Sequence, residues 1–151
     1  MIDGGLRDKF RDKLRRGWHW QSVETGGTGR GIPDSNFCAS TSHPSGDGWI
    51  VGVEGWIEFK KTDAWSVGLR TEQIGWIRER TIRGGRVFVA TRRQTQGGVR
   101  LGAPVDEIWL HSGRVVSELG KHGLKGPEPL IVCSGGPENW DWEKIGKILC
   151  R

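Results

Sequence analysis

The sequence predicts an α/β domain, and three observations lead to that prediction. The chain has 151 residues, which is the length of one compact domain with a substantial core. Between residues 6 and 91, helix-like and strand-like patterns follow one another in the order helix, three strands, helix, strand. The 25 glycines divide the chain into short elements joined by turns. We therefore expect a single domain over residues 1–151.

The first elements follow from the spacing of apolar residues. Leucine and phenylalanine recur every four positions in residues 6–16, which predicts a helix with one apolar stripe. Strands are expected at residues 18–24 and 32–39, and a glycine-rich loop at residues 25–31 separates them. Pro33 stands at the beginning of the second strand, where a missing backbone N–H is tolerated.

The middle of the chain continues with strands. Residues 40–48 have the composition of a turn, and two further strands are expected at residues 49–53 and 55–61. In the second of these strands, apolar and polar residues alternate. Because side chains on a strand alternate between its two faces, this strand should have one apolar face.

The remaining elements begin with a second helix. Thr71 is a suitable N-cap for a helix that ends at the Gly84-Gly85 pair, and an apolar strand is expected at residues 86–91. Three short strands and a last helix are then expected at residues 107–111, 114–117, 130–133 and 142–149.

The charge of the chain favours a polyanionic partner. Twenty-three Lys and Arg against 18 Asp and Glu give a formal net charge of +5, and seven arginines but only one acid lie between Arg78 and Arg100. A positive surface of this kind favours nucleic acid, although so modest a charge also fits a role in solubility alone. No apolar run approaches the roughly 20 residues that cross a bilayer, so we expect no membrane segment and a cytoplasmic location.

Cysteine and histidine form no recognisable site. The three cysteines are widely spaced without a CxxC motif, which predicts neither a disulfide framework nor a cysteine zinc site and fits a reducing compartment. The four histidines are also scattered, which argues against a zinc site and against a triad with a histidine base.

Three residues on two strands can combine into a site. If the two strands are neighbours, Asp34 lies beside Glu58, and two carboxylates at one point call for a cation. Mg²⁺ suits carboxylate oxygens and water, and it takes further oxygen ligands from a substrate phosphate. With Lys60 positioning a water or screening phosphate charge, this arrangement suits phosphodiester hydrolysis. The alternative is that Glu58 and Lys60 form a surface ion pair, because the tripeptide ExK is common.

The same residues carry a resemblance to a known family. Ile32-Pro33-Asp34 followed by Trp56-Ile57-Glu58-Phe59-Lys60 resembles the PD-(D/E)xK nuclease superfamily. The resemblance implies a restriction-endonuclease-like core with the order αβββαβ and a mixed central sheet flanked by helices. Leu69-Arg70-Thr71-Glu72-Gln73, with the glycine pair and apolar strand after it, is similar to a segment of archaeal-type Holliday junction resolvases and VRR-NUC nucleases. The resemblance covers a core at about residues 6–93 and leaves residues 94–151 as a C-terminal extension.

The resemblance implies a role for each matching residue. Asp34 and Glu58 are expected to bind Mg²⁺, or alternatively Mn²⁺, and Lys60 is expected to be the catalytic lysine. Gln73 is expected to support the site or to contact the scissile phosphate.

The first helix departs from the family pattern. Many members carry a glutamate there, whereas this helix has only Asp8 and Asp12 as acids. Asp8 lies nearer the usual distance from the strand, so we expect Asp8 to complete the metal site. Glu54 and Asp63, which flank the strand, are expected to be exposed to solvent, and Glu24 is a weaker candidate.

The activity implied is that of a Mg²⁺-dependent DNA endonuclease selective for branched DNA such as four-way junctions. A junction with two strands to cut favours a symmetric homodimer. The small isolated chain also resembles those encoded by bacteriophages. Two alternatives stay open: another nuclease of this fold, acting on flaps, nicks or restriction sites, and a DNA-binding module of the same fold that does not cleave.

Basic and aromatic side chains are the candidates for contact with DNA. The residues expected to contact phosphates are Arg30, Lys61, Arg78, Arg83, Arg86, Arg92 and Arg93. The nine tryptophans admit two interpretations, which are packing in the core and stacking on unpaired bases. We favour packing for most of them and expect Trp65, in a polar stretch after the ExK strand, to be exposed.

Overall fold

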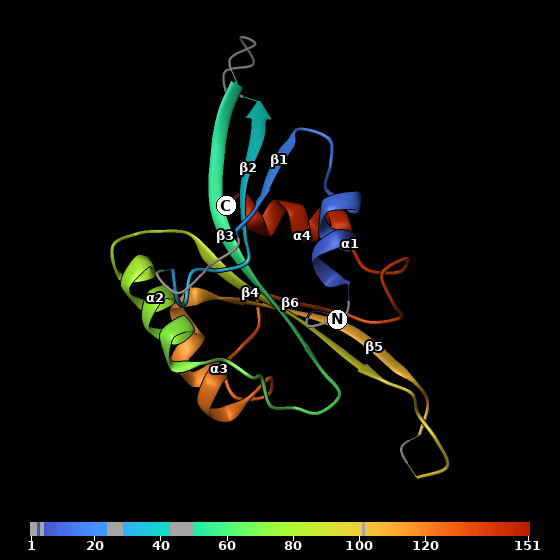
Figure 1. Ribbon diagram of the computed structural model, residues 1–151. Coiled ribbons are helices and arrows are strands. Elements are labelled where there is room, and N and C mark those ends of the chain that lie inside the picture. Colours follow the sequence, from blue (N-terminus) through green and yellow to red (C-terminus); the bar gives the residue numbers. More distant parts are fainter. Residues whose placement is uncertain (1–2, 4, 24–28, 43–49, 101) are drawn as a thin grey trace.

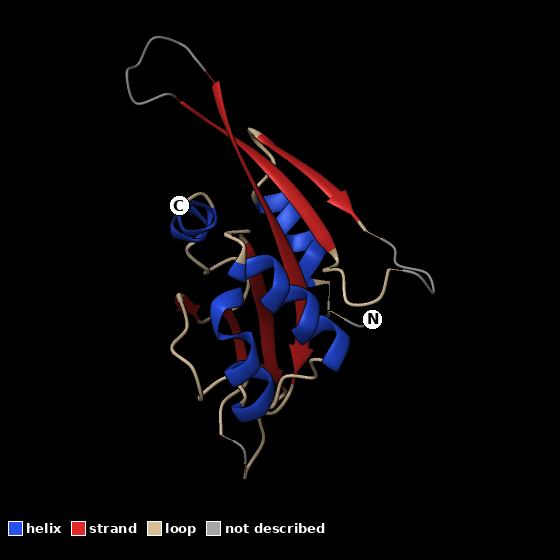
Figure 2. Ribbon diagram, turned by 90° about the vertical axis from the view of Figure 1, so that its left-hand side faces the viewer, coloured by secondary structure: helices blue, strands red, loops and turns tan. Residues whose placement is uncertain are grey.

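A six-stranded sheet with helices on both faces forms the molecule (Figure 1 and Figure 2). The computed structural model describes residues 3, 5–23, 29–42, 50–100 and 102–151. The strands are β1 (Trp18–Ser22), β2 (Ser35–Ser42), β3 (Ile50–Thr62), β4 (Val87–Thr95), β5 (Val105–Ser112) and β6 (Ile131–Cys133). The helices are α1 (Leu6–Lys13), α2 (Thr71–Ile82), α3 (Val116–His122), α4 (Trp142–Leu149) and the 3₁₀ turn η1 (Gly113–Val115). The predicted α/β class, with a mixed sheet flanked by helices, is confirmed.

The order of the strands in the sheet is the same as their order in the chain. The pairs β1–β2, β2–β3, β4–β5 and β5–β6 are antiparallel, and β3–β4 is parallel. A parallel pair needs a crossover connection, which α2 provides. The C-terminal third of the chain therefore continues the sheet through β5 and β6.

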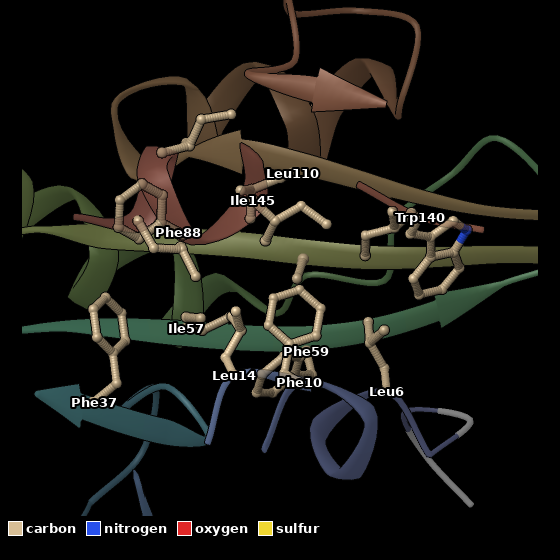
Figure 3. Close-up of a cluster of buried hydrophobic side chains, with 14 residues drawn as sticks. Leu6, Phe10, Leu14, Phe37, Ile57, Phe59, Phe88, Leu110, Trp140 and Ile145 are labelled. Atoms are coloured by element: carbon tan, nitrogen blue, oxygen red, sulfur yellow. The ribbon is translucent and has the colours of Figure 1, made fainter. Parts of the chain in front are cut away.

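One face of the sheet is covered by α1 and α4. Phe10 of α1 packs edge-on against Phe59 of β3 and against Trp142 of α4, at centroid distances of 5.1 and 5.0 Å. Figure 3 shows the buried residues of this core, among them Phe10, Phe59, Ile57 of β3 and Ile145 of α4. Since Ile57 and Phe59 point into this core, the residues between and beyond them on β3 point to the opposite face.

The opposite face is covered by α2 and α3. Ile77 of α2 and Leu119 of α3 pack with Val87 and Val89 of β4 in a second buried cluster. The alternation predicted for residues 55–61 is thereby confirmed: its apolar residues meet α1 and α4, and its polar residues meet α2.

Two expected strands are one continuous strand. Residues 49–53 and 55–61 were predicted separately, whereas β3 runs from Ile50 to Thr62 without a break. Gly55 is paired with Phe37 of β2, and a Cβ at this position would lie 2.5 Å from the phenylalanine ring. This glycine therefore makes room for a neighbouring ring and does not mark a turn.

The strand expected at residues 114–117 is wrong. These residues form η1 and the start of α3. The Ser112 side chain accepts a hydrogen bond from the Arg114 N–H at 3.2 Å, which begins the turn. Val116 and Leu119 are then buried three positions apart, which is helical spacing.

Several predicted boundaries also shift. The first helix ends at Lys13 rather than at residue 16, and the carbonyl of Leu14, the residue after it, accepts the Trp20 indole N–H at 2.8 Å. β1 ends at Ser22 and β2 begins at Ser35, so that Pro33 precedes the strand. The expected loop 25–31 and turn 40–48 lie partly outside the described residues. Among the helices that are described, none is long and apolar enough to cross a membrane.

Candidate active site

Asp34 and Glu58 are brought together by the pairing of β2 with β3. Ser35 is opposite Ile57 in this ladder, so Asp34, one residue earlier, lies beside Glu58. The Asp34 N–H donates to Glu58 Oε2 at 3.1 Å, and the Phe59 N–H donates to Asp34 Oδ2 at 3.0 Å. Each carboxylate therefore accepts a backbone N–H from the segment that carries the other carboxylate.

Gln73 joins the site from the first turn of α2. Its Nε2 donates to Glu58 Oε1 at 2.6 Å, and its Oε1 accepts from Lys60 Nζ at 3.0 Å. The same Oε1 accepts from the Arg70 N–H at 3.0 Å, so the side chain also caps the helix. The N-cap is therefore Arg70, one residue before the predicted Thr71.

Lys60 completes the group on the α2 face of β3. Its Nζ lies 3.5 Å from Glu58 Oε1, and its side chain is 14% exposed. Period-two spacing along β3 gives Glu58 and Lys60 the same face, as the sequence predicted.

Burial raises the pKa of both carboxylates. Burial raises the pKa of Glu58 to about 7, and repulsion from Asp34 adds to this effect, while attraction by Lys60 opposes it. Burial also raises the pKa of Asp34, against the hydrogen bond from Phe59 and the attraction of Lys60 and Arg7. When both carboxylates are ionised, the site holds more negative charge than Lys60 alone neutralises.

This charge balance and donor set fit a divalent cation. Repulsion by Asp34 helps to raise the pKa of Glu58, and a cation between the two carboxylates relieves that repulsion. Mg²⁺ keeps several waters and takes only one or two protein carboxylates, so Asp34 and Glu58 suffice as protein ligands. Within the described ranges, no group of three or more acids, histidines or cysteines is arranged to hold a metal ion.

The structure does not bring Asp8 to this site. Asp8 is exposed on α1, as is Asp12. The charges that act on Asp34 from this end of the chain are those of Arg7 and Asp3. Asp3 accepts hydrogen bonds from the Gly5 N–H at 2.9 Å and from the Arg7 N–H at 3.4 Å, so it binds the backbone at the start of α1.

Sequence reasoning missed Asp3 and the role of Arg7. The available signal was an Asp shortly before a predicted helix, which is typical of a cap. Glu54 and Asp63 are exposed, as expected, and Glu24 lies outside the described residues.

Four of the seven basic residues expected to contact DNA are exposed. These are Arg30, Lys61, Arg78 and Arg83. Their exposure leaves them accessible to phosphates, and Arg83 also pairs with Glu79 on the surface of α2.

The other three expected DNA contacts have structural partners. Arg86 donates to the carbonyls of Arg151, at 2.9 Å, and of Leu149, so it binds the end of α4. Arg92 binds Asp106 through two hydrogen bonds of 2.8 and 2.7 Å. Arg93 lies 3.4 Å from Glu107. Sequence could not foresee these acceptors, because α4 and β5 supply them from distant parts of the chain.

Most tryptophans are packed, as expected. Trp18 and Trp20 stack on each other at 5.5 Å, and Trp56 meets Trp76 edge-on at 5.3 Å. The Trp65 side chain is 38% exposed, which agrees with the prediction for this residue. Trp49 lies outside the described residues.

Comparison of the chain with protein-family models, with curated proteins and with solved structures finds no match.

Proposed function

We propose that this chain is a metal-dependent endodeoxyribonuclease that hydrolyses phosphodiester bonds, with branched DNA as its preferred substrate. The observation that carries the proposal is the convergence of Asp34, Glu58, Lys60 and Gln73 at one point of the sheet. Burying Glu58 next to the half-buried carboxylate of Asp34 costs folding free energy, even with a lysine beside them. Metal-assisted hydrolysis accounts for this arrangement, because the same groups would hold a cation against a phosphate.

Asp34 and Glu58 would hold Mg²⁺, or alternatively Mn²⁺, through their carboxylate oxygens. When bound, such an ion polarises the phosphodiester and lowers the pKa of a nearby water. Glu58 has to be ionised for this role, and its pKa of about 7 makes metal binding depend on pH near neutrality.

Lys60 and Gln73 are the other two residues of the site. Lys60 would bind the water or the phosphate, and Gln73 would orient Glu58 and Lys60. The Lys60 ammonium donates to the attacking water or to the phosphate oxygens, on which negative charge develops. The Gln73 amide holds Glu58 Oε1 and Lys60 Nζ at distances of 2.6 and 3.0 Å, so it orients an acceptor and a donor together.

Exposed basic residues support DNA as the partner. Arg30, Lys61, Arg78 and Arg83 can neutralise phosphates, which predicts affinity that falls steeply with salt. Preference for branched DNA and a homodimeric state rest on the resemblance to junction resolvases. Light scattering of the purified protein tests the dimer, and a monomer at all concentrations and on junction DNA contradicts it.

The deciding experiment compares cleavage of four DNA substrates in Mg²⁺: a four-way junction, a flap, a nicked duplex and a linear duplex. We expect the junction to be cut fastest, whereas equal cutting of all four contradicts selectivity for branched DNA. Lys60→Ala and Glu58→Ala should abolish cleavage and keep DNA binding. Lys144→Ala is the matched control, because Lys144 is an exposed lysine on α4, which covers the opposite face of the sheet. Wild-type protein that binds DNA and never cleaves it is a binding module.

A further inference from the structure

A second group of side chains lies beyond the end of β3. Trp65 is 38% exposed, and two cations lie over its ring. The Arg93 guanidinium carbon is 3.8 Å from the ring centroid, and Lys125 Nζ is 3.9 Å from it. Trp109 of β5 meets the same ring edge-on at 6.0 Å. We call these four residues the Trp65 cluster.

The Trp65 cluster is held in place by its backbone and by Glu107. The Trp65 carbonyl accepts the Leu124 N–H at 2.8 Å. A Cβ on Gly123, whose φ is +76°, would lie 2.4 Å from that carbonyl oxygen, so only glycine fits against it. Glu107 accepts from the Trp109 indole at 2.8 Å and lies 3.4 Å from Arg93. These contacts fix the ring at the surface before any ligand binds.

The Trp65 cluster is on the same face of the sheet as the candidate active site. Lys60 is paired with Thr91 in the β3–β4 ladder, and Thr62 is paired with Arg93. Strand geometry then separates the Cα atoms of Lys60 and Arg93 by about 8 Å, which is short enough for adjoining nucleotides of one strand to reach both. A groove of about 710 Å³ adjoins Arg93 at the ends of β3 and β4.

A half-exposed tryptophan beside two cations has the chemistry of a nucleotide site. An aromatic ring stacks on a nucleobase without regard to sequence, and the cations bind the phosphate next to it. In a duplex the base faces are already stacked on their neighbours, so only an unpaired base can offer a face to Trp65. Lys125 is exposed, so its ammonium can move from the ring to the phosphate when a base arrives.

We propose that Trp65, Arg93 and Lys125 bind an unpaired nucleotide of the strand that passes the candidate active site. The proposal names the substrate class as DNA with unpaired nucleotides, and its position next to the cut rests on the proposed function. Stacking on Trp65 would favour branched or discontinuous DNA over continuous duplex.

The test measures binding of a labelled single-stranded oligonucleotide and of the matching duplex by fluorescence anisotropy, without metal so that no DNA is cut. Trp65→Ala should weaken single-strand binding roughly 10-fold and duplex binding less than about 2-fold. Trp65→Phe should retain most of the single-strand affinity, because a smaller ring still stacks. Trp76→Ala is the matched control, since Trp76 also lies beneath an arginine, with Arg80 at 4.7 Å, but on α2. Thermal unfolding checks that each variant is folded.

Several results would overturn the proposal. They are no single-strand binding by wild type, unchanged binding by Trp65→Ala, and an equal loss for single strand and duplex. The outcomes separate this proposal from the proposed function. If cleavage depends on Lys60 but not on Trp65, the proposed nucleotide site is wrong and the proposed nuclease activity stands. If single-strand binding depends on Trp65 but the protein never cleaves DNA, the proposed nuclease activity is wrong and the nucleotide site stands.

Discussion

The Gln73 amide nitrogen donates to Glu58 Oε1 across 2.6 Å, in a part of the molecule where both side chains are buried. The Gln73 oxygen accepts from Lys60 and from the backbone of Arg70, so the orientation of the amide is determined by its partners. One side chain therefore caps α2 and aligns the two groups proposed to bind metal and water.

Gln73→Glu should shift the pH dependence of cleavage upwards. A carboxylate at this position cannot donate to Glu58, and its charge raises the pKa of Glu58 further. We expect cleavage at pH 7 to fall roughly 10- to 100-fold, with partial recovery at pH 9. Rate profiles from pH 6 to 9 measure this shift, with Gln21→Glu on β1 as the control. An unchanged profile shape contradicts the positioning role.

The free energy of unfolding should fall as pH rises through neutrality in the absence of metal. The folded-state pKa of Glu58 is about 7 against 4.5 for the ordinary side chain, so folding favours the protonated form. The resulting stability is complete below about pH 4.5 and is lost as pH rises past 7, to an extent on the order of 3 kcal/mol. Urea unfolding between pH 5 and 8 tests this for wild type and Glu58→Gln. We expect the variant to show a much flatter dependence than wild type and than Glu118→Gln, an exposed control on α3.

Mg²⁺ should stabilise the folded protein, and the effect should grow with pH. An ion that binds only the folded state raises its stability by mass action, by about 2.7 kcal/mol at 100 times Kd. Thermal unfolding at pH 8 should show a higher midpoint in MgCl₂ than in NaCl of equal ionic strength. Asp34→Asn should remove the difference. If the unfolding midpoint of Asp34→Asn rises as much in MgCl₂ as that of wild type, the stabilising ions are bound elsewhere.

Asp8→Asn should leave cleavage within about twofold of wild type, because Asp8 is exposed and removal of an exposed charge has little effect. Asp34→Asn should reduce cleavage by at least about 100-fold, since it removes a proposed metal ligand. Both variants lose one negative charge, so each controls for the other in DNA affinity. A large loss of cleavage activity in Asp8→Asn would show that the first helix does supply a further metal ligand.

Arg86→Ala should mainly lower the stability of the protein, whereas Arg83→Ala should mainly weaken DNA binding. Arg86 holds the carbonyls of Leu149 and Arg151, so its loss should lower the free energy of unfolding by about 2 kcal/mol. Arg83 is exposed, and its loss should change stability by less than about 0.5 kcal/mol while weakening DNA binding. Urea unfolding and DNA anisotropy at low salt separate the two effects. Equal stability of both variants contradicts the structural role of Arg86.

Local patterns predicted much of the fold. The i, i+4 stripe in the first helix, the alternation around Phe59 and the apolar strand after the glycine pair all correspond to elements of the structure. Glycines predicted the breaks between elements less reliably, since Gly55 lies inside a strand and accommodates the Phe37 ring. The strand predicted at residues 114–117 is wrong because a short segment with two valines fits a strand or a helix equally well, and only its buried partners decide between them.

The sequence by itself determined which residues share a face. Glu58 and Lys60 lie on one side of β3 and Phe59 on the other, because the direction of a strand side chain depends only on its position in the strand. It also indicated a helix that begins near Thr71, with Gln73 in its first turn.

The tertiary structure alone decided which groups meet. Pairing of β2 with β3 put Asp34 beside Glu58, and docking of α2 brought Gln73 to both Glu58 and Lys60. It also gave Arg86 its partners at the end of α4 and left Trp65 at the surface. Such contacts join residues far apart in the chain, so they depend on the packing of whole elements and leave no periodic signal in the sequence.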